Sequence, residues 1–373
     1  MRKIRITFLC ILDLQSASTI RLQNYAVELA KIGHEINFLV SPGVNKEIEK
    51  ININYISEIQ RKPFRGVSLM FSSLFSLLKT KKPDILHFSK PLPVSGFPCI
   101  FYKKIKNIPI ICDWDDIEGV KGFSKFRKFP EKDIINYFER WIPRHVDGIT
   151  TVSDNLKKYA LKYCKNVLKL PQLCLIDKFN PNISGEEIRK RYSLIGKKVL
   201  MFTGGLGNFS DADICIKAMK YVVKEYKNTV LVIIGKGIAK PRFEELVKKL
   251  ELEDYVKFLK TVPFDLMPEY LAAADVLLLP MNSKWINNYY RLPIKMFDYM
   301  SMGKPIVGQN VGEIKILKNK IILTKPTVED FSNGILKVLD SKKNIGQKAR
   351  KFAEKELYLK QVKRLEIFYQ KFI

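Results

Sequence analysis

The feature that most constrains the fold of this chain is a regular alternation of short apolar runs with amphipathic helical stretches. The first half contains the strand-like runs IRITFLCIL, EINFLV, DILHF, IPIICDWDD and GITTVS, and helical stretches such as RLQNYAVELAKIGH and residues 131–141 separate them. Strands that alternate with helices in this way are typical of βαβ units. We therefore expect a parallel, doubly wound α/β sheet.

The alternation begins again after a break at residues 179–187, where FNPNISGEE supplies polar and turn-forming residues. The second series includes KVLMFTGG, TVLVIIGKG, YVKFL and DVLLLP. Two Rossmann-like units predict a ligand cleft between them, at the carboxyl ends of both sheets. We expect a first domain at 1–183 and a second at 184–356. We also expect one basic, aromatic-rich helix from about residue 344, which ends in a terminal segment at 357–373.

The composition is that of an ordinary globular protein. The 373 residues are long enough for two α/β domains, and 46% of them are hydrophobic. The longest apolar run, at residues 66–78, is too short to span a bilayer, and the N-terminal run lacks a small-residue cleavage site, so a signal peptide is not expected. The six cysteines have no CxxC spacing, which favours buried thiols in a reducing cytoplasm over a zinc site.

The formal charge of +27 predicts an anionic partner. Nucleic acid, an anionic membrane face and a polyanionic substrate are all compatible with it. Cations are interleaved with aromatic residues in KKIK at 103–106 and KGFSKFRKF at 121–129, and residues 61–82 add six more cations beside the apolar run. This pattern favours an anionic membrane surface, with a merely solvated basic surface as the alternative.

The stretch RLPIKMFDYMSMGKPIV at residues 291–307 is the most informative motif of the second half. Pro293 suits the first turn of a helix, where the free N–H groups, Arg291 and Lys295 would receive a diphosphate. Asp298 follows one turn later, and Gly303 ends the helix before a strand. The alternative interpretation is a surface ion pair between Lys295 and Asp298 at i, i+3.

This stretch resembles the nucleotide-sugar-binding motif of the group 1 (family 4) glycosyltransferases, which often read PxKxxEYMAxGxPVV here. The resemblance implies the GT-B fold, with a nucleotide-sugar donor on the second domain and an acceptor on the first. It also implies that the terminal helix crosses back to the first domain. No cofactor and no metal ion are expected, because Arg291, Lys295 and helix N–H groups would neutralise the departing diphosphate.

The resemblance also implies further donor-site residues. The family often has an arginine in the turn after this strand and a lysine a few residues later, where this chain has Gly205, within TGGLGN at 203–208, and approximately Ser210. Asp298 takes the place of the acid that binds the ribose hydroxyls, and Tyr290 replaces an acid that contacts the donor sugar. The residues expected around the donor are Gly204, Gly205, Gly235, Gly237, Arg291, Lys295, Asp298 and Glu313. For the glycines and Glu313, a tight turn or a helix-start acid is the alternative.

The acids of CDWDD at residues 112–116 end an apolar strand, which points them toward the predicted cleft. Because crowded carboxylates repel one another, one of them could titrate high enough to act as a base. We therefore propose Asp115 or Asp116 as the acceptor-side base, with a helix cap or loop salt bridge as the alternative. Asp113 and Asp115 also match the DxD metal motif of another glycosyltransferase fold, which the two-unit pattern disfavours. His87 ends the DILHF strand and is a candidate acceptor contact.

The function that the sequence predicts is a hexosyltransferase that moves a sugar from a nucleotide diphosphate donor to a lipid-linked or cell-envelope glycan. The protein would be cytoplasmic and peripheral on the inner face of the cell membrane. A sugar-nucleotide epimerase or phosphorylase of the same architecture is the alternative enzyme. A basic nucleic-acid-binding protein is the alternative of another class, although the cations are spread rather than set in one reader helix.

Overall fold

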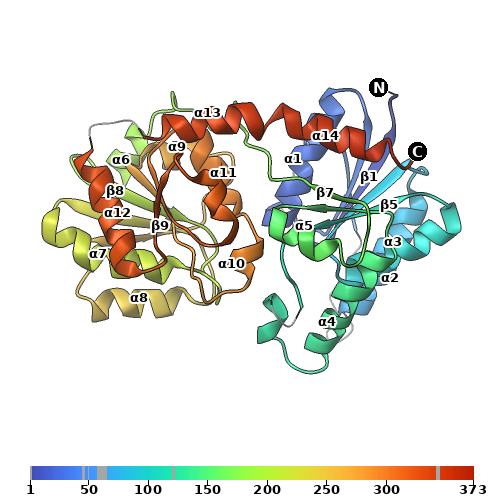
Figure 1. The fold of residues 1–373 in the computed structure, drawn as a ribbon, viewed down its shortest axis with the longest axis horizontal. Helices are drawn as coiled ribbons and strands as arrows, with labels where there is room; N and C mark the ends of the chain where they lie inside the picture. The colour runs from blue at the N-terminus through green and yellow to red at the C-terminus, as the bar shows by residue number, and fades with distance from the viewer. Residues whose placement is uncertain (1, 44–46, 49, 57–64, 120–121, 342–344) are drawn as a thin grey trace. The chain divides into compact units, whose positions relative to one another are not determined.

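The computed structural model describes residues 2–43, 47–48, 50–56, 65–119, 122–341 and 345–373 (Figure 1). The chain divides into two compact units. Unit 1 comprises Met1–Leu173 together with Leu359–Ile373, and unit 2 comprises Cys174–Tyr358. The sequence analysis places the corresponding boundaries after residues 183 and 356. Each unit is an α/β sandwich with its own parallel sheet, as the alternating pattern predicts.

The described residues of unit 1 form a seven-stranded parallel sheet in the order β3-β2-β1-β4-β5-β6-β7. Its strands are β1 (Arg5–Cys10), β2 (Glu35–Val40), β3 (Asn52–Tyr55), β4 (Ile85–Ser89), β5 (Ile110–Trp114), β6 (Gly148–Thr151) and β7 (Val167–Lys169). The central strands β4 and β5 are buried along their whole length, because helices cover both faces of a doubly wound sheet.

Helices lie on both faces of the unit 1 sheet. They are α1 (Ala17–Lys31), α2 (Arg65–Lys79), α3 (Pro93–Lys106), α4 (Glu131–Trp141), α5 (Asp154–Ala160) and α14 (Leu359–Tyr369), with the 3₁₀ turns η1 (Phe123–Phe126) and η2 (Ile142–Arg144). The start of α5 shows how the sequence sets a boundary: the Ser153 hydroxyl accepts from the Leu156 N–H at 3.1 Å, which caps the helix. The predicted helix at residues 131–141 is confirmed.

The described residues of unit 2 form a six-stranded parallel sheet in the order β10-β9-β8-β11-β12-β13. Its strands are β8 (Lys198–Thr203), β9 (Thr229–Ile234), β10 (Val256–Leu259), β11 (Val276–Leu279), β12 (Ile306–Gln309) and β13 (Ile322–Thr324). Side chains alternate between the faces: Leu200 and Phe202 belong to one core, and Val199 and Met201 belong to the other.

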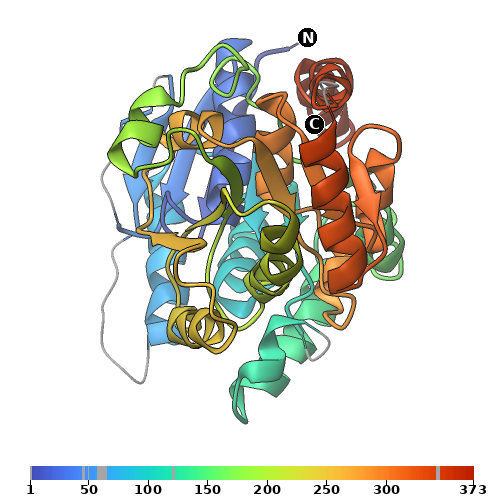
Figure 2. The ribbon, with the colours of Figure 1, turned by 90° about the vertical axis from the view of Figure 1, so that its left-hand side faces the viewer.

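The helices of unit 2 complete these two cores. They are α6 (Glu186–Arg191), α7 (Ala212–Glu225), α8 (Lys240–Lys249), α9 (Met267–Ala272), α10 (Asn287–Tyr290), α11 (Ile294–Ser301), α12 (Val328–Asp340) and α13 (Gln347–Glu356), with the 3₁₀ turn η3 (Gly312–Leu317). Figure 2 looks onto the layer formed by α7, α8 and α12, which bury Met219, Phe243 and Phe331 against the sheet. Residues of α9, α11 and α13 contribute to the other core.

The terminal segment contains two helices where the sequence analysis expects one. Helix α13 belongs to unit 2, and α14 packs with α1 in unit 1, so the terminal helix does return to the first unit. The chain breaks between them because the Leu357 carbonyl accepts from the Cys174 N–H at 2.8 Å instead of continuing a helical ladder. The Tyr358 hydroxyl donates to Asp177 at 3.0 Å, which holds the break in place.

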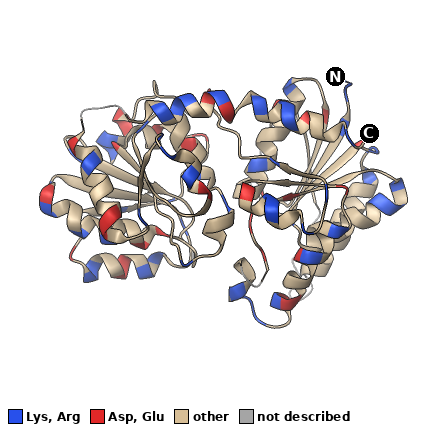
Figure 3. Cartoon of the chain, in the orientation of Figure 1, with Lys and Arg blue, Asp and Glu red and all other residues tan. Residues whose placement is uncertain are grey.

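All six cysteines are buried and free, as the sequence predicts. Among the described residues, no helix is long and apolar enough to cross a membrane. Lys and Arg residues are distributed over the helices of both units (Figure 3). The excess positive charge is therefore not confined to one helix.

Candidate functional site

The first candidate site lies in unit 2, where the glycine turn after β8 meets the start of α11. The Lys295 ammonium lies 3.7 Å from the centre of the Phe202 ring. It also lies 2.7 Å from the position that a Cβ atom on Gly204 would occupy, and Gly204 has φ 142°. Gly204 therefore leaves room for Lys295 and adopts a backbone conformation that other residues disfavour.

Lys295 is unusual among the lysines of this chain because its pKa is lowered to about 7. Burial is the main cause, the Arg291 charge adds to it, and Asp211 opposes it. A buried lysine gains more free energy from binding an anion than an exposed lysine does, because its charge is poorly solvated before binding. Lys295 and Arg291 thus form a pair of cations at the start of a helix, where free N–H groups also attract anions.

Arg291 is held by two polar residues of unit 2. Its Nε atom donates to the Asn288 side-chain oxygen at 2.9 Å, and its Nη2 atom lies 4.0 Å from the Asp211 carboxylate. The Asn288 amide donates to the same carboxylate at 3.0 Å. Asp211 is buried, which raises its pKa against the influence of Arg291. The sequence analysis missed Asp211, because an acid just before a helix is ordinarily read as a cap.

Asp298 lies on α11 away from Lys295. The alternative interpretation of a Lys295–Asp298 ion pair is wrong, since no such pair forms in the described part of the chain. Burial raises the pKa of Asp298 to about 7, and Lys178 opposes that shift. Pro293 occupies the N-cap position of α11, one residue earlier than expected, and Gly303 ends the helix with φ 63° as predicted.

The second glycine turn packs directly on the first. A Cβ atom on Gly235 would lie 2.0 Å from the Gly204 carbonyl oxygen, and one on Gly237 would lie 2.2 Å from the Leu206 carbonyl oxygen. The Leu206 N–H donates to the Lys236 carbonyl at 2.9 Å. The structure thus requires glycine at these two positions for backbone packing, and their contact with a nucleotide stays a prediction.

We predict that Gly237→Ala lowers the free energy of unfolding of unit 2 by about 1–3 kcal/mol, because the new methyl group meets backbone atoms that cannot move aside. Gly205→Ala is the matched control: nothing lies within 4 Å of its Cβ position, so we expect a change within about 0.5 kcal/mol. Chemical denaturation of both variants measures the difference. Equal stability of the two variants would contradict the packing argument.

Glu313 lies in the first turn of η3 and is buried. The turn is fixed by Gly312, which has φ 55°, and a Cβ atom there would lie 2.5 Å from the Asn288 carbonyl oxygen and from the Tyr289 Cα atom. Close packing of η3 on α10 therefore places Glu313 beside the helix that also supplies Asn288.

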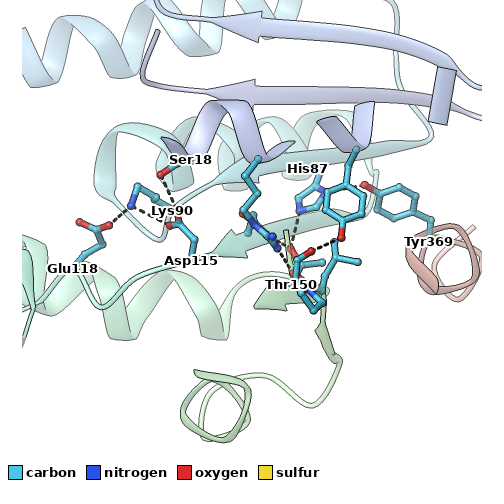
Figure 4. Close-up of polar contacts among 12 residues, drawn as sticks. Ser18, His87, Lys90, Asp115, Glu118, Thr150 and Tyr369 are labelled. Atoms are coloured by element: carbon cyan, nitrogen blue, oxygen red, sulfur yellow. Dashed lines mark hydrogen bonds and ion pairs between the residues drawn. The ribbon is translucent and has the colours of Figure 1, made fainter. Parts of the chain in front are cut away.

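The second candidate site is a buried polar cluster at the carboxyl ends of β4 and β5 in unit 1 (Figure 4). Arg21 of α1 forms two bonds with Asp113, at 2.9 and 3.1 Å, and the Thr150 hydroxyl donates to the same carboxylate at 2.5 Å. Both charged side chains are almost completely buried. Because Asp113 is paired with a guanidinium and Asp115 with an ammonium, the DxD spacing serves ion pairing here.

Lys90 lies between Asp115 and Glu118 (Figure 4). Its ammonium is 3.0 Å from Asp115, to which the Ser18 hydroxyl also donates at 2.6 Å. Burial would raise the pKa of Asp115, but Lys90 and these hydrogen bonds lower it below its ordinary value. The expectation that crowding raises a pKa therefore fails for Asp115, because the cation that follows β4, Lys90, could not be identified from the sequence.

Asp116 is less buried than Asp115, and its carbonyl accepts from the Trp114 indole N–H at 2.9 Å. His87 is fully buried in the core of unit 1, where its ring nitrogens lie 2.7 Å from the Tyr369 hydroxyl and 3.1 Å from the Thr150 hydroxyl. Burial, followed by the Arg21 charge, lowers the pKa of His87 to about 3. The interpretation of His87 as an acceptor contact is therefore wrong, and its role is structural.

Comparison with known families gives one match in each unit. A model described as glycosyltransferase family 4 matches residues 19–167, and a model described as glycosyl transferases group 1 matches residues 197–341. Together the two matches span most of the chain. They include Lys90, Asp113 and Asp115 of the unit 1 site and Arg291, Lys295 and Asp298 of the unit 2 site.

Individual proteins are similar at low identity. The chain is 25% identical over 300 residues to chitobiosyldiphosphodolichol beta-mannosyltransferase of Candida albicans. This alignment covers 72% of this chain and 62% of that protein. It is 22% identical over 303 residues to alpha-monoglucosyldiacylglycerol synthase of Streptococcus pneumoniae, with coverage of 77% and 66%. The chain thus spans about two thirds or less of the length of these curated relatives.

Solved structures share the whole fold. Sucrose-phosphate synthase of Thermosynechococcus elongatus superposes with a TM-score of 0.80 at 14% identity, over 99% of each chain. The Anabaena HepE protein in complex with UDP-glucose superposes with a TM-score of 0.78 at 14% identity, over 99% of this chain and 100% of that one. Each unit of this chain therefore has the Rossmann-like architecture of the GT-B fold.

Proposed function

Because this chain belongs to the group 1, family 4-like glycosyltransferases, we propose that it is a hexosyltransferase whose unit 2 binds a nucleotide diphosphate sugar and whose unit 1 binds a lipid-linked or cell-envelope glycan. The observation that supports this proposal most directly is the placement of Lys295 beneath Gly204, with Arg291 one turn before it. Two cations and free helix N–H groups converge where a diphosphate would lie.

In this proposal the diphosphate is the leaving group. Negative charge grows on it as the bond to the sugar breaks, and Arg291 and Lys295 stabilise that charge because they are held in place beforehand. The proposed reaction needs no metal ion, since these cations supply the positive charge. The Asp298 carboxylate accepts hydrogen bonds from the ribose hydroxyls, and the glycine turn at Gly204 and Gly205 allows the backbone to approach the donor.

On the acceptor side, we propose Asp115 and Asp116 as the groups that orient and deprotonate the acceptor hydroxyl. Asp115 is held ionised and in a fixed position by Lys90 and Ser18. It therefore suits an electrostatic and orienting role, while the more exposed Asp116 suits proton transfer. A normal transfer rate in Asp115→Asn and Asp116→Asn proteins would reject both roles.

Thermal stabilisation by nucleotide sugars tests the donor site. We expect one nucleotide series among UDP-, GDP-, ADP- and dTDP-sugars to raise the melting temperature, because a ligand that binds only the folded state stabilises it. Asp298→Ala should abolish or strongly reduce the shift, and Asp213→Ala, which removes an acid of α7 that pairs with Lys217, should retain it. No shift with any nucleotide sugar would contradict the donor assignment.

A lipid-linked acceptor requires contact with a membrane, and unit 1 has a suitable face. Helices α2 and α3 pack side by side (Figure 1). They expose Phe71 on α2, at 67%, and Phe101 on α3, at 46%, with Lys104 beside Ile105. Exposed aromatic and aliphatic side chains among lysines suit insertion into anionic headgroups. Residues 61–64 and residue 121 of the basic segments named above lie outside the described residues.

We predict that the Phe101→Ser/Ile105→Ser double variant lowers binding to vesicles of phosphatidylglycerol and phosphatidylcholine by about tenfold or more, because two apolar side chains no longer insert. Tyr221→Ser, which removes an exposed side chain from α7 in unit 2, is the control and should bind as the unaltered protein does. Vesicle sedimentation measures the bound fraction. If the unaltered protein stays in the supernatant, the peripheral, cytoplasmic-face assignment fails, while the donor assignment is unaffected.

A further inference from the structure

At the β3 edge of the unit 1 sheet, one face carries polar side chains where a doubly wound sheet is normally apolar. Both faces of such a sheet are covered by helices, so its strands usually carry continuous hydrophobic side chains. Along β1, β2 and β3 the register pairs Arg5 with Glu35 and Asn37 with Asn52. Asn54 follows two residues after Asn52 and lies on the same face. Five polar side chains thus share one side of the sheet edge.

These side chains line a pocket between the sheet and α2. The pocket has a volume of about 400 Å³, and α2 contributes Phe75, Ser76 and Lys79 to its other wall. Every lining residue belongs to unit 1. We call this cavity the β1–β3 face pocket.

Some polar atoms of the residues that line this pocket have no hydrogen-bond partner among the described residues. The Asn54 amide donates to the Asn37 side-chain oxygen at 2.7 Å, but the buried Asn37 amide nitrogen has no partner among the described residues. The same holds for the Nε atom of Arg5, a second residue that lines the pocket. Because buried donors without partners are rare in folded proteins, two of them in one pocket lining favour a polar ligand.

The chemistry of the lining indicates the class of ligand. Side-chain amides both donate and accept hydrogen bonds, as paired sugar hydroxyls require. Phe75 is 58% exposed, with the Lys79 ammonium 4.2 Å from its ring centre, and offers an apolar surface for the C–H face of a sugar ring. Arg5 and Glu35 pair at 2.9 Å and so balance each other's charge. Hydroxyl-rich ligands match the amides and the exposed ring, and Lys79 and Lys81 also line the pocket.

We propose that the β1–β3 face pocket is a second glycan-binding site, which holds an oligosaccharide segment away from the site of sugar transfer. Arg5 and Glu35 begin their strands, whereas Lys90 and Asp115 lie just beyond the ends of β4 and β5. In a parallel sheet these are opposite edges, so the pocket does not belong to the proposed catalytic cluster. The proposal also uses none of the residues assigned to the nucleotide sugar, so the two assignments fail independently.

The test is calorimetric titration of the full chain with mannohexaose, maltohexaose and chitohexaose, without a nucleotide sugar. We expect at least one hexasaccharide to bind, and Asn54→Ala and Phe75→Ala each to weaken it by about threefold to tenfold, through a lost hydrogen bond and a lost ring contact. Phe71→Ala is the matched control, because Phe71 lies one turn earlier on α2 and does not line the pocket. It should bind the hexasaccharide as the unaltered protein does.

The substituted side chains are exposed, so the variants are expected to fold, and unchanged melting temperatures verify this. Absence of binding by all three hexasaccharides at millimolar concentration overturns the proposal. Binding that is equally strong in Asn54→Ala and Phe75→Ala also overturns it, because the glycan would then lie elsewhere. Retained stabilisation by a nucleotide sugar in the same variants shows that only the glycan site was altered.

Discussion

Lys295→Ala is expected to lower kcat/KM for the nucleotide sugar by about 100-fold or more, which is the usual effect of removing one preorganised group that stabilises developing charge. The ammonium is positioned by the Phe202 ring and by the space at Gly204, so no neighbouring lysine can replace it. Arg291 is also engaged by Asn288 and cannot neutralise the whole diphosphate alone. Steady-state transfer assays with the donor identified by thermal stabilisation measure the effect.

The pH dependence of donor binding provides a sharper signature of the same residue. In the free protein the pKa of Lys295 is about 7, and a bound diphosphate raises it. Below pH 7 the lysine is already protonated and takes up no proton on binding, whereas Asp298, whose pKa is also about 7, must lose its proton there to accept from the ribose as a carboxylate. Above pH 7 the affinity falls as pH rises, approaching about tenfold per pH unit, until the pH reaches the raised pKa of the complex. Titrations between pH 6 and 9 follow this decline.

Two variants separate the effect of the Lys295 charge from the effects of lost side-chain volume and of removing any lysine. Lys295→Met keeps much of the side-chain volume but has no charge, so it should bind the donor weakly and without the decline above pH 7. Lys224→Ala removes an exposed lysine of α7 and should leave both kcat/KM and the pH profile unchanged. An undiminished kcat/KM in Lys295→Met would show that the lysine fills space rather than stabilising charge.

The fold was predictable because its signals are local. The helix at residues 131–141 and the strands near IRITFLCIL and TVLVIIGKG show the periodicities of helix and buried strand within the segment itself. The short strands β3 and β13 were not predicted, because four or three residues are too few to establish a period. The break between α13 and α14 was also missed, since it depends on a hydrogen bond to Cys174, far away in the sequence.

The same difference between local sequence signals and contacts with distant residues applies to the candidate sites. Lys295 and Asp298 could be proposed as donor-site residues because a helix start, a proline and a glycine surround them in one stretch. The partners of Asp115 could not, because Lys90 and Ser18 come from other strands and helices, and nothing in their local sequence indicates a buried charge. Spacing alone therefore indicated a reactive acid, whereas the fold supplies the cation that lowers its pKa.

Arg21→Met is expected to destabilise unit 1 by about 3–5 kcal/mol, the range observed when one partner of a buried ion pair is removed. Arg21 donates twice to Asp113 and once to the Leu170 carbonyl at 2.5 Å, and its side chain is 2% exposed. Without it, the Thr150 hydroxyl is the one side-chain partner left to the Asp113 carboxylate among the described residues. The melting temperature of unit 1 should fall by on the order of 10 °C, which calorimetry measures.

The double variant Arg21→Met/Asp113→Leu distinguishes the loss of the ion pair from the loss of side-chain packing around Arg21. With both charges gone, the desolvation cost of Asp113 disappears, so the double variant should regain much of the stability lost in Arg21→Met. Hydrogen exchange can assign the effect, because β1 and β5 should exchange faster in the single variant while β8 of unit 2 should not. If the double variant is less stable than Arg21→Met, then packing around the guanidinium, rather than its charge, stabilises this core.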